Sequence, residues 1–345
     1  MNRANNASAA SVYMAGLHES WERGTPLVAP LQAVLSVASR CDSRCRYCDA
    51  WRPGSPPEPS LADIVRVMGE MADLGVERLN LSGGEPLLRG DLEEMVSRAT
   101  ESGLAVGLLT NGRKLTATRL SSLRDAGLRF VSLSIDSLDS RRYLRLRGVS
   151  PAGAYAALQS LAHLQAASPG FVATVLAVLS RENLDDIEEL VTECERLGLF
   201  FQMQPVQAFS HRHQAHLAAE GLALTEGDAA AVANMVRRVS SSPMSIGSSE
   251  YLSGMVDRLA GRGCNASPCY AGYAILNVDV RLDVRPCWPM PAAGSLYDAR
   301  LKDVWHSDAF AEARKRMRRR DCIGCHLICH AERVRSLAWL SEPKT

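Results

Sequence analysis

The sequence predicts an α/β fold with a parallel sheet or barrel, followed by a smaller cysteine-rich region. Two observations support this prediction. Short apolar runs alternate with helical patterns from residue 31 to about residue 206, and nine of the ten cysteines lie either between residues 41 and 48 or after residue 263. Strand–helix–strand units in series favour right-handed crossovers, which place successive strands parallel in one sheet.

The strand candidates are short runs that are apolar on both faces, as strands of a covered parallel sheet are. They are residues 31–38, 78–81, 105–109, 130–135, 171–179 and 200–206. The helices between them have recognisable ends: Ser60 and Asp63 form a capping-box-like start, and Gly75 follows that helix. Asn183 opens a second helix, which ends before Gly198.

Length and charge limit the classes of function. A chain of 345 residues with a formal net charge of +1 has no overall field that would draw it to nucleic acid or to a membrane surface. No apolar run reaches the ~20 residues that a membrane helix needs. The start of the chain has no apolar signal segment, so we expect a cytoplasmic protein. The predicted divisions are an N-terminal arm (1–30, a loose segment or short helix), a core (31–244) and a cysteine-rich domain (245–345).

Cys41, Cys45 and Cys48 stand close together, with three and then two residues between them. Soft thiolates select zinc, copper(I) or an iron–sulfur cluster. A [4Fe–4S] cube usually takes four cysteines, so a loop that gives three leaves one iron open for chemistry. A structural zinc site would need a nearby fourth ligand, and the candidates are Asp42 and Asp49. Disulfides fit poorly in a chain without a secretory signal.

This loop, with Tyr47 before the third cysteine, resembles the signature of the radical S-adenosylmethionine (radical SAM) superfamily. In that family the open iron chelates the amino and carboxylate groups of S-adenosylmethionine, which is cleaved to a 5′-deoxyadenosyl radical. The resemblance implies a partial (β/α)6 TIM-like barrel with the cysteine loop at the C-terminal mouth. It also implies a [4Fe–4S] cluster there and places Tyr47 near the adenine.

The turn after the second strand reads Gly83-Gly84-Glu85-Pro86. Two glycines allow a close approach of the backbone to a ligand, and a carboxylate can accept an ammonium group. An ordinary strand–helix turn is the alternative reading. The segment matches the family's Gly-Gly-Glu-Pro motif, which holds the methionine amino group.

Polar residues also follow the next two strands. Asn111 stands in a turn after the third strand, and Ser134 and Asp136 share one side of the end of the fourth. In the family this strand end commonly reaches the ribose or the carboxylate, and Arg147 resembles an arginine that contacts the methionine carboxylate. Any of these residues could instead cap the next helix.

The second cysteine group consists of Cys264, Cys269, Cys287, Cys322, Cys325 and Cys329. A hairpin-like stretch at 274–285 and the basic run 314–320 would fit a zinc-ribbon nucleic-acid module, although such a run usually forms a solvated face. Beside the first domain, the layout resembles the family's SPASM and twitch extensions. That resemblance implies one auxiliary [4Fe–4S] cluster held by Cys269, Cys287, Cys322 and Cys325.

Two departures from the SPASM pattern affect this assignment. Leu282 stands where the family places a glycine, five residues before the second cysteine, and the last cysteine group is too short for two closed clusters. The roles of Cys264 and Cys329 therefore stay open. Each could replace a ligand, remain a buried thiol, or donate a hydrogen atom to a substrate radical.

The resemblance implies an enzyme, and we expect a radical SAM oxidoreductase or epimerase. The expected substrate is a sugar or aminocyclitol-type natural-product intermediate, and the alternative is maturation of a ribosomal peptide. An alternative of another class is a non-catalytic zinc or iron–sulfur protein that binds nucleic acid. Expected partners are a small-molecule or peptide substrate and an external reductant such as flavodoxin or ferredoxin, without membrane or nucleic acid.

Overall fold

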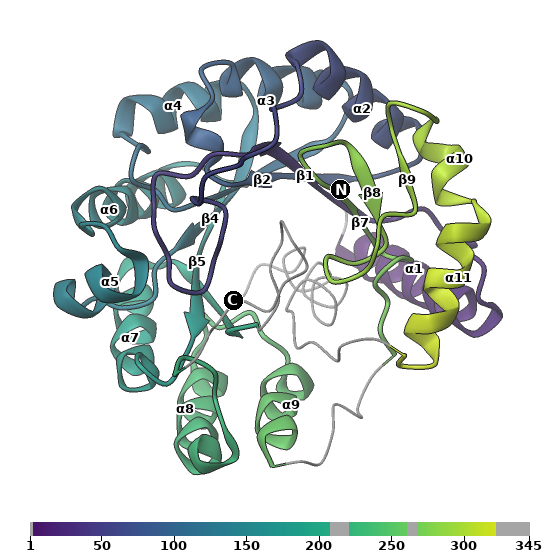
Figure 1. The fold of residues 1–345 in the computed structure, drawn as a ribbon. Helices are drawn as coiled ribbons and strands as arrows, with labels where there is room; N and C mark the ends of the chain where they lie inside the picture. The colour runs from purple at the N-terminus through teal and green to yellow at the C-terminus, as the bar shows by residue number, and fades with distance from the viewer. Residues whose placement is uncertain (1–2, 208–220, 261–267, 322–345) are drawn as a thin grey trace.

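The computed structural model describes residues 3–207, 221–260 and 268–321. In these ranges the chain forms an open barrel, with one sheet inside and helices around it (Figure 1). The strands are β1 (Gln32–Ala38), β2 (Arg78–Gly83), β3 (Ala105–Thr110), β4 (Leu128–Ser134), β5 (Val172–Leu179), β6 (Phe200–Pro205), β7 (Ile275–Val278), β8 (Asp283–Arg285) and β9 (Gly294–Ser295). The helices are α1 (Arg3–Arg23), α2 (Leu61–Asp73), α3 (Leu92–Glu101), α4 (Ala117–Asp125), α5 (Ser140–Arg147), α6 (Ala152–Ala167), α7 (Ile187–Leu197), α8 (Ala229–Ser241), α9 (Ser249–Leu259), α10 (Leu301–Trp305) and α11 (Asp308–Arg318).

The strand order across the described sheet is β6-β5-β4-β3-β2-β1-β7-β8-β9. Strands β1 to β6 are parallel neighbours, β7 joins β1 in parallel, and β8 and β9 return antiparallel. Each predicted strand of the first domain is present, and so is the hairpin predicted at 274–285. The prediction of a partial barrel followed by a smaller region is confirmed.

The core lies between the outer faces of the strands and the helices. Helix α2 shows how the sequence builds it: the Ser60 side chain accepts a hydrogen bond from the Asp63 backbone N–H (3.1 Å) and starts the helix. Its apolar stripe, which includes Ile64 and Met68, is fully buried in the main core. Full burial of such a side chain contributes about 1.5–3 kcal/mol.

The inner face of the sheet has a different character. Side chains alternate along a strand, so those next to core residues point into the barrel. Asn80, Ser132 and Thr174 occupy such positions, and the register places Ser132 opposite Thr174. The barrel interior is therefore lined with polar groups, unlike the apolar layer beneath the helices.

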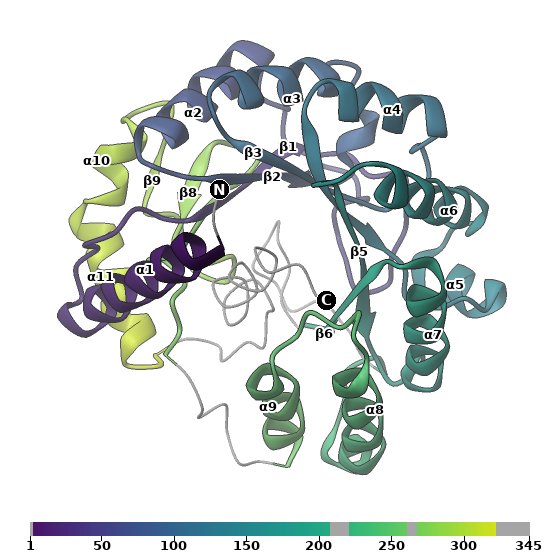
Figure 2. The same ribbon diagram turned by 180° about the vertical axis from the view of Figure 1, so that it is seen from behind.

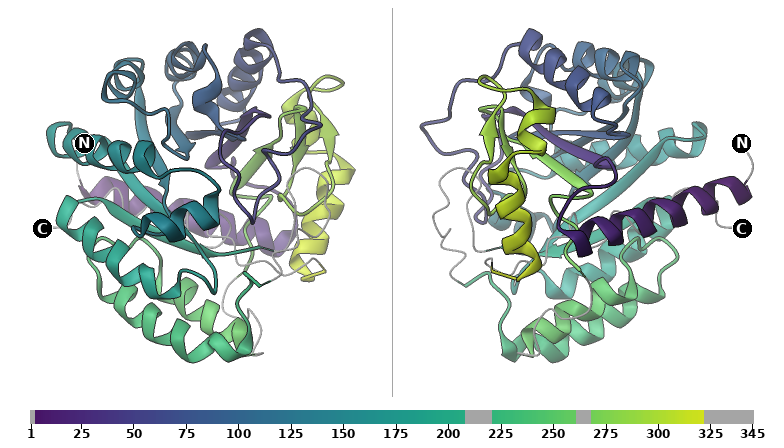
Figure 3. Two further views of the ribbon diagram at one scale, coloured as in Figure 1. Left: turned by 60° about the vertical axis from the view of Figure 1, so that its left-hand side comes forward. Right: turned by 90° about the vertical axis from the view of Figure 1, so that its right-hand side faces the viewer.

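The two ends of the barrel are covered by different segments. The stretch between β1 and α2, which carries the first three cysteines, lies over the carboxyl ends of the strands and faces the viewer in Figure 1. Helix α1 lies across the opposite end, as Figure 2 and the right-hand view of Figure 3 show. The first residues, expected as a loose arm or short helix, thus form a 21-residue helix. Its Leu17 packs against Tyr273 and Ile275.

The basic run at 314–320 is only partly the solvated face that its charge predicts. Arg314 on α11 is 1% exposed and donates hydrogen bonds to the backbone oxygens of Gly272 (2.7 Å) and Trp305 (2.9 Å). Its guanidinium also lies 4.2 Å from the centroid of the Phe310 ring. Arg318 donates to the backbone oxygen of Glu22 on α1. These arginines hold helices together, which argues against a nucleic-acid face.

None of the helices in the described ranges combines the length and the apolar character that crossing a membrane requires.

Candidate cofactor site

The cysteine loop is anchored on the C-terminal end of α5. The backbone N–H of Arg44 donates to the oxygen of Arg147 (2.9 Å), and that of Arg46 donates to the oxygen of Leu146 (3.0 Å). The helix ends at Gly148, whose φ of 66° is a left-handed value that glycine adopts without strain. A Cβ at Gly148 would lie 2.8 Å from the Cβ of Arg44. The small residue therefore allows the loop to dock.

Trp51 closes the other side of the loop. Its indole N–H lies 2.9 Å from the backbone oxygen of Cys48 and 3.2 Å from that of Cys45. One donor thus ties together the two cysteine backbones. Sequence reasoning did not single out this residue, although a tryptophan three positions after the third cysteine was visible.

The three thiols lie close enough to influence one another. Cys45 is buried, and Cys41 and Cys48 are half-buried. Burial raises the pKa of Cys41 to about 12, with smaller contributions from the nearby Glu85 carboxylate and the other two thiols. Burial likewise raises the pKa of Cys45 to about 11, against the lowering effect of Arg147. Within the described ranges no group of three potential ligands is already arranged around a metal position.

The glycine pair lies against the cysteine loop. The N–H of Gly84 donates to the oxygen of Ala38 (2.7 Å), and that of Glu85 donates to the oxygen of Arg40 (2.8 Å). Gly83 has a φ of 123°, and a Cβ there would lie 2.2 Å from the oxygen of Ala38. A Cβ on Gly84 would lie 2.1 Å from the oxygen of Arg40. In the structure the close approach that both glycines allow is to the protein's own backbone.

The carboxylate of Glu85 is turned inward. The residue is 1% exposed, and Pro86 after it starts a short 3-10 turn (Pro86–Leu88). Its oxygens accept hydrogen bonds from the N–H of Leu87 (3.0 Å), the hydroxyl of Thr110 (2.7 Å) and the N–H of Asn111 (2.7 Å). Burial raises the pKa of Glu85 to about 7, and these hydrogen bonds oppose the rise. The side chain thus joins β2 to the end of β3.

Asn111 links β3 to the cysteine loop. Its amide nitrogen donates to Oδ1 of Asp42 (2.8 Å) and lies 3.9 Å from the sulfur of Cys41. Arg113 lies 3.0 Å from Oδ2 of the same aspartate. The structure therefore brings Asn111 to the first cysteine, as the predicted site requires.

Asp136 and Arg147 form a buried pair behind the cysteine loop, and Tyr47 of the loop contacts this pair. Arg147 donates through Nη2 to Oδ1 of Asp136 (2.9 Å), and its Nε lies 2.8 Å from Oδ2. Tyr47 donates its hydroxyl to Oδ2. Asp136 is 0% exposed and Arg147 is 3% exposed. Asp136 and Arg147 were predicted to contact the cofactor, whereas in the structure their charged groups bind each other.

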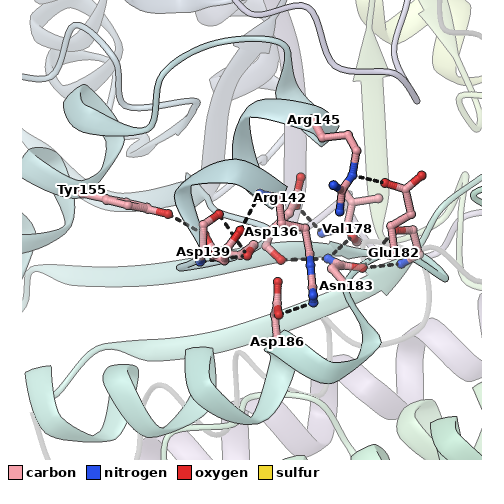
Figure 4. A network of polar contacts seen from close by, with 11 residues as sticks. Asp136, Asp139, Arg142, Arg145, Tyr155, Val178, Glu182, Asn183 and Asp186 are labelled. Carbon is pink, nitrogen blue, oxygen red and sulfur yellow. Dashed lines mark hydrogen bonds and ion pairs between the residues drawn. The ribbon is translucent and has the colours of Figure 1, made fainter.

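Asn183 completes the surroundings of Asp136 (Figure 4). Its amide nitrogen donates to the backbone oxygens of Asp136 (2.8 Å) and Val178 (3.0 Å), and its amide oxygen accepts from the N–H of Ser180 (2.8 Å). Asn183 precedes the helical segment that it was expected to open, which begins at Leu184 and continues into α7. Its side chain makes no capping bond there and instead joins β4 to β5. Ser134 lies half-buried at the end of β4, on the barrel side.

The second cysteine group is described only in part. Cys269 and Cys287 lie in one small apolar cluster with Met290 and Met317. Cys264, Cys322, Cys325 and Cys329 fall outside the described residues. Leu282, where the family pattern has glycine, has a φ of 59° and is fully buried. The backbone is therefore left-handed at this position although a leucine occupies it, at a cost of roughly 1–2 kcal/mol.

The comparisons with known proteins agree with this architecture. Residues 35–194 match the family model described as "Radical SAM superfamily". Residues 269–326 match the model described as "Iron-sulfur cluster-binding domain" (SPASM). Residues 35–194 thus form a radical SAM domain, and residues 269–326 form a C-terminal SPASM domain. The first domain implies a [4Fe–4S] cluster with S-adenosylmethionine, and the second implies auxiliary iron–sulfur clusters. Three soft thiol donors on one loop fit the first of these groups.

Among curated proteins, the chain is 35% identical to the PqqA peptide cyclase of Rhizobium meliloti (strain 1021) over 178 residues. That alignment covers 51% of this chain and 47% of the relative. The chain is 34% identical to the PqqA peptide cyclase of Methylocella silvestris over 174 residues, which are 50% of this chain and 46% of that one. The matched part thus spans about half the length of these relatives.

Among solved structures, Streptococcus suis SuiB bound to precursor peptide SuiA has a TM-score of 0.68 at 18% identity. The match covers 92% of this chain and 74% of SuiB. The structure of anSMEcpe with bound AdoMet has a TM-score of 0.62 at 15% identity and covers 82% of each chain. At these identities the likeness shows the fold.

The relatives correct one expectation from the sequence. A sugar or aminocyclitol-type intermediate was expected as the substrate, but the curated relatives are named as peptide cyclases. The expectation of oxidation or epimerisation of such a small molecule is therefore wrong.

Proposed function

We propose that this protein is a radical SAM enzyme that modifies a ribosomally made peptide, in the manner of a peptide cyclase. The observation that carries the proposal is the 33–35% identity of about half the chain to several PqqA peptide cyclases. The fold shared with SuiB, which was solved with its precursor peptide, is compatible with a substrate of this class.

We assign the first cluster to Cys41, Cys45 and Cys48, whose loop is held by Trp51 and by α5. Three thiolates leave one metal position open for S-adenosylmethionine. The reduced cluster and its cofactor, when bound, supply a carbon-centred radical that removes a hydrogen atom from an unactivated C–H bond.

The chain's own residues hold the cofactor and keep the loop in place. The main chain of residues 83–86 is assigned to the methionine amino group, because the Glu85 carboxylate is occupied inside the protein. Tyr47 is assigned to the adenine, and Ser134 and Asn111 to polar groups of the cofactor. Asp136 and Arg147 act from behind by supporting the loop.

The auxiliary cluster is assigned to Cys269, Cys287, Cys322 and Cys325. Its surroundings in the described residues are apolar, which suits a buried metal centre. The electron that starts each reaction has to come from outside the chain, and we propose a cytoplasmic flavodoxin or ferredoxin as the source.

Mass spectrometry of a candidate peptide tests the proposal. The anaerobically reconstituted protein is incubated with S-adenosylmethionine, a reductant and a short peptide encoded beside its gene. We expect a change in peptide mass that depends on S-adenosylmethionine and is lost when Cys41, Cys45 and Cys48 are all replaced by alanine. Turnover of S-adenosylmethionine with unchanged peptide, and modification of a small molecule instead, would contradict the proposed substrate class.

A further inference from the structure

A small pocket lined by both polar and apolar residues lies on the inner face of the barrel, below the cofactor motif. Its polar lining residues are Arg78 and Asn80 from β2, Ser132 from β4, Thr174 from β5 and Gln202 from β6. The pocket has a volume of about 30 Å³. One water-sized oxygen needs about 10–15 Å³ of such space, so the pocket holds about two oxygen atoms. That is the size of a carboxylate group.

Two buried groups in the pocket have unmet hydrogen-bonding capacity. Asn80 is 3% exposed, and neither its amide nitrogen nor the hydroxyl of Ser132 has a hydrogen-bond partner in the described part of the chain. Glycine at position 107 makes room for the amide, because a Cβ there would lie 2.4 Å from its oxygen. Burying a donor without a partner is costly, so such groups mark a place where a ligand supplies the acceptor.

The charge of the pocket selects an anion. The guanidinium of Arg78 lies 3.5 Å from the centroid of the Phe130 ring, a cation–π contact that keeps the charge beside the pocket. Among the described residues that line the pocket there is no aspartate or glutamate. A guanidinium beside an amide N–H and a hydroxyl is the donor set that binds a carboxylate well.

The position of the pocket relates it to the reaction. Asn80 and Ser82 share one face of β2, because side chains alternate along a strand. From Asn80 to Gly83 the strand rises by roughly 10 Å, at about 3.3 Å per residue. A substrate whose carboxylate is held in the pocket would therefore extend its carbon chain toward the cofactor motif.

We propose that this pocket binds a carboxylate of the substrate, namely the side chain of an acidic residue in the peptide. The assignment of this carboxylate to a peptide side chain rests on the proposed function. The affinity of the pocket for a carboxylate does not. Arg78 provides the positive charge, and Asn80 and Ser132 donate the hydrogen bonds that orient the carboxylate.

Fluorine NMR with a small probe tests the pocket without any peptide. Fluoroacetate is titrated into the full-length reconstituted protein, and broadening of its fluorine signal is compared with that of the neutral fluoroacetamide. We expect saturable broadening for fluoroacetate alone. Arg78→Met should weaken this binding by at least about tenfold, as expected for the loss of a hydrogen bond to a charged group. Ser132→Ala, which removes one hydroxyl and little volume, should weaken it less.

Arg129→Met is the matched control, since Arg129 is exposed, precedes Phe130 on β4, and its guanidinium lies 5.9 Å from the centroid of the same ring. Binding should be unchanged in this variant. Equal broadening by both probes, equal loss in the Arg78 and Arg129 variants, or no broadening at all would overturn the pocket assignment. Fluoroacetate binding together with an unmodified peptide would refute the proposed function and leave the pocket standing. A modified peptide whose KM is the same in Arg78→Met and wild type would overturn the substrate assignment.

Discussion

The carboxylate of Asp136 and the guanidinium of Arg147 form an ion pair that is almost completely removed from solvent, directly behind the cysteine loop. The same arginine accepts the backbone N–H of Arg44 through its main-chain oxygen, and the same aspartate accepts the hydroxyl of Tyr47. One buried pair thus connects β4, α5 and the loop that carries the thiols. Its contribution is to fix the loop, because buried pairs add little net stability on their own.

Breaking this pair from one side should be costly. Arg147→Met leaves the Asp136 carboxylate buried without its cation, which is expected to lower the free energy of unfolding by about 3–5 kcal/mol. Combining Arg147→Met with Asp136→Asn removes both charges and should recover part of the loss. Denaturant unfolding of the four proteins in this cycle measures the coupling.

The control for that cycle is Arg145→Met on the same helix. Arg145 is 55% exposed and pairs with Glu182 at the surface, so its loss should cost less than about 1 kcal/mol. Single variants of the buried pair that are as stable as this control would show that the pair does not hold the loop.

Trp51→Phe should loosen the cysteine loop. The replacement keeps a ring but removes the N–H that two cysteine carbonyls share, which leaves both oxygens without that donor. We expect less iron retained per chain and a broadened EPR signal of the reduced cluster. Trp21→Phe is the control, because the indole N–H of Trp21 has no hydrogen-bond partner among the described residues. Equal iron retention in the two variants would rule out this role for Trp51.

Gly84→Ala should separate the glycine motif from the cysteine loop. The new Cβ would lie 2.1 Å from the oxygen of Arg40, which is backbone and cannot rotate away. We expect a loss on the order of 3 kcal/mol in the free energy of unfolding. Gly90→Ala places its Cβ in open space and should change little. The unfolding midpoints of the two variants, measured by calorimetry or with denaturant, test this expectation. Equal midpoints would count against a close contact at Gly84.

Glu85 should titrate near neutral pH. Burial raises its pKa from 4.5 to about 7, so the protonated form is favoured in the folded protein. The sign follows from linkage: the contribution of Glu85 to folding stability is full below pH 4.5 and is lost as the pH rises through 7, a loss on the order of 3 kcal/mol. Infrared difference spectra of wild type minus Glu85→Gln should show a protonated carboxyl band that disappears around pH 7. A band already absent at pH 6 would contradict the shift.

The periodicity of the chain was enough to predict the parallel strands and the hairpin, because buried strands and capped helices leave local signals. The cysteine spacing likewise predicted the loop. The Asp136–Arg147 pair could not be derived in the same way. Both residues were identified, but whether a charged side chain faces a cofactor or another side chain depends on contacts between elements that are distant in sequence.

Trp51 and Leu282 are two further features that could not be predicted from sequence patterns. A tryptophan after the third cysteine has no periodic signal, and its role appears only when its N–H is placed between two carbonyls. Leu282 departs from the SPASM pattern, and its left-handed backbone could not be predicted from the residue type, because leucine rarely adopts that conformation.

EPR of the reduced protein before and after addition of S-adenosylmethionine tests the central claim most directly. If the Cys41, Cys45 and Cys48 thiolates hold a cube with one open iron, the signal of that cluster changes when the cofactor binds, and 5′-deoxyadenosine accumulates under dithionite. Replacing the three cysteines by alanine should remove both effects and leave the signal of the auxiliary cluster. A loop that holds zinc alone, or a cofactor that stays intact beside a reduced cluster, would contradict the account.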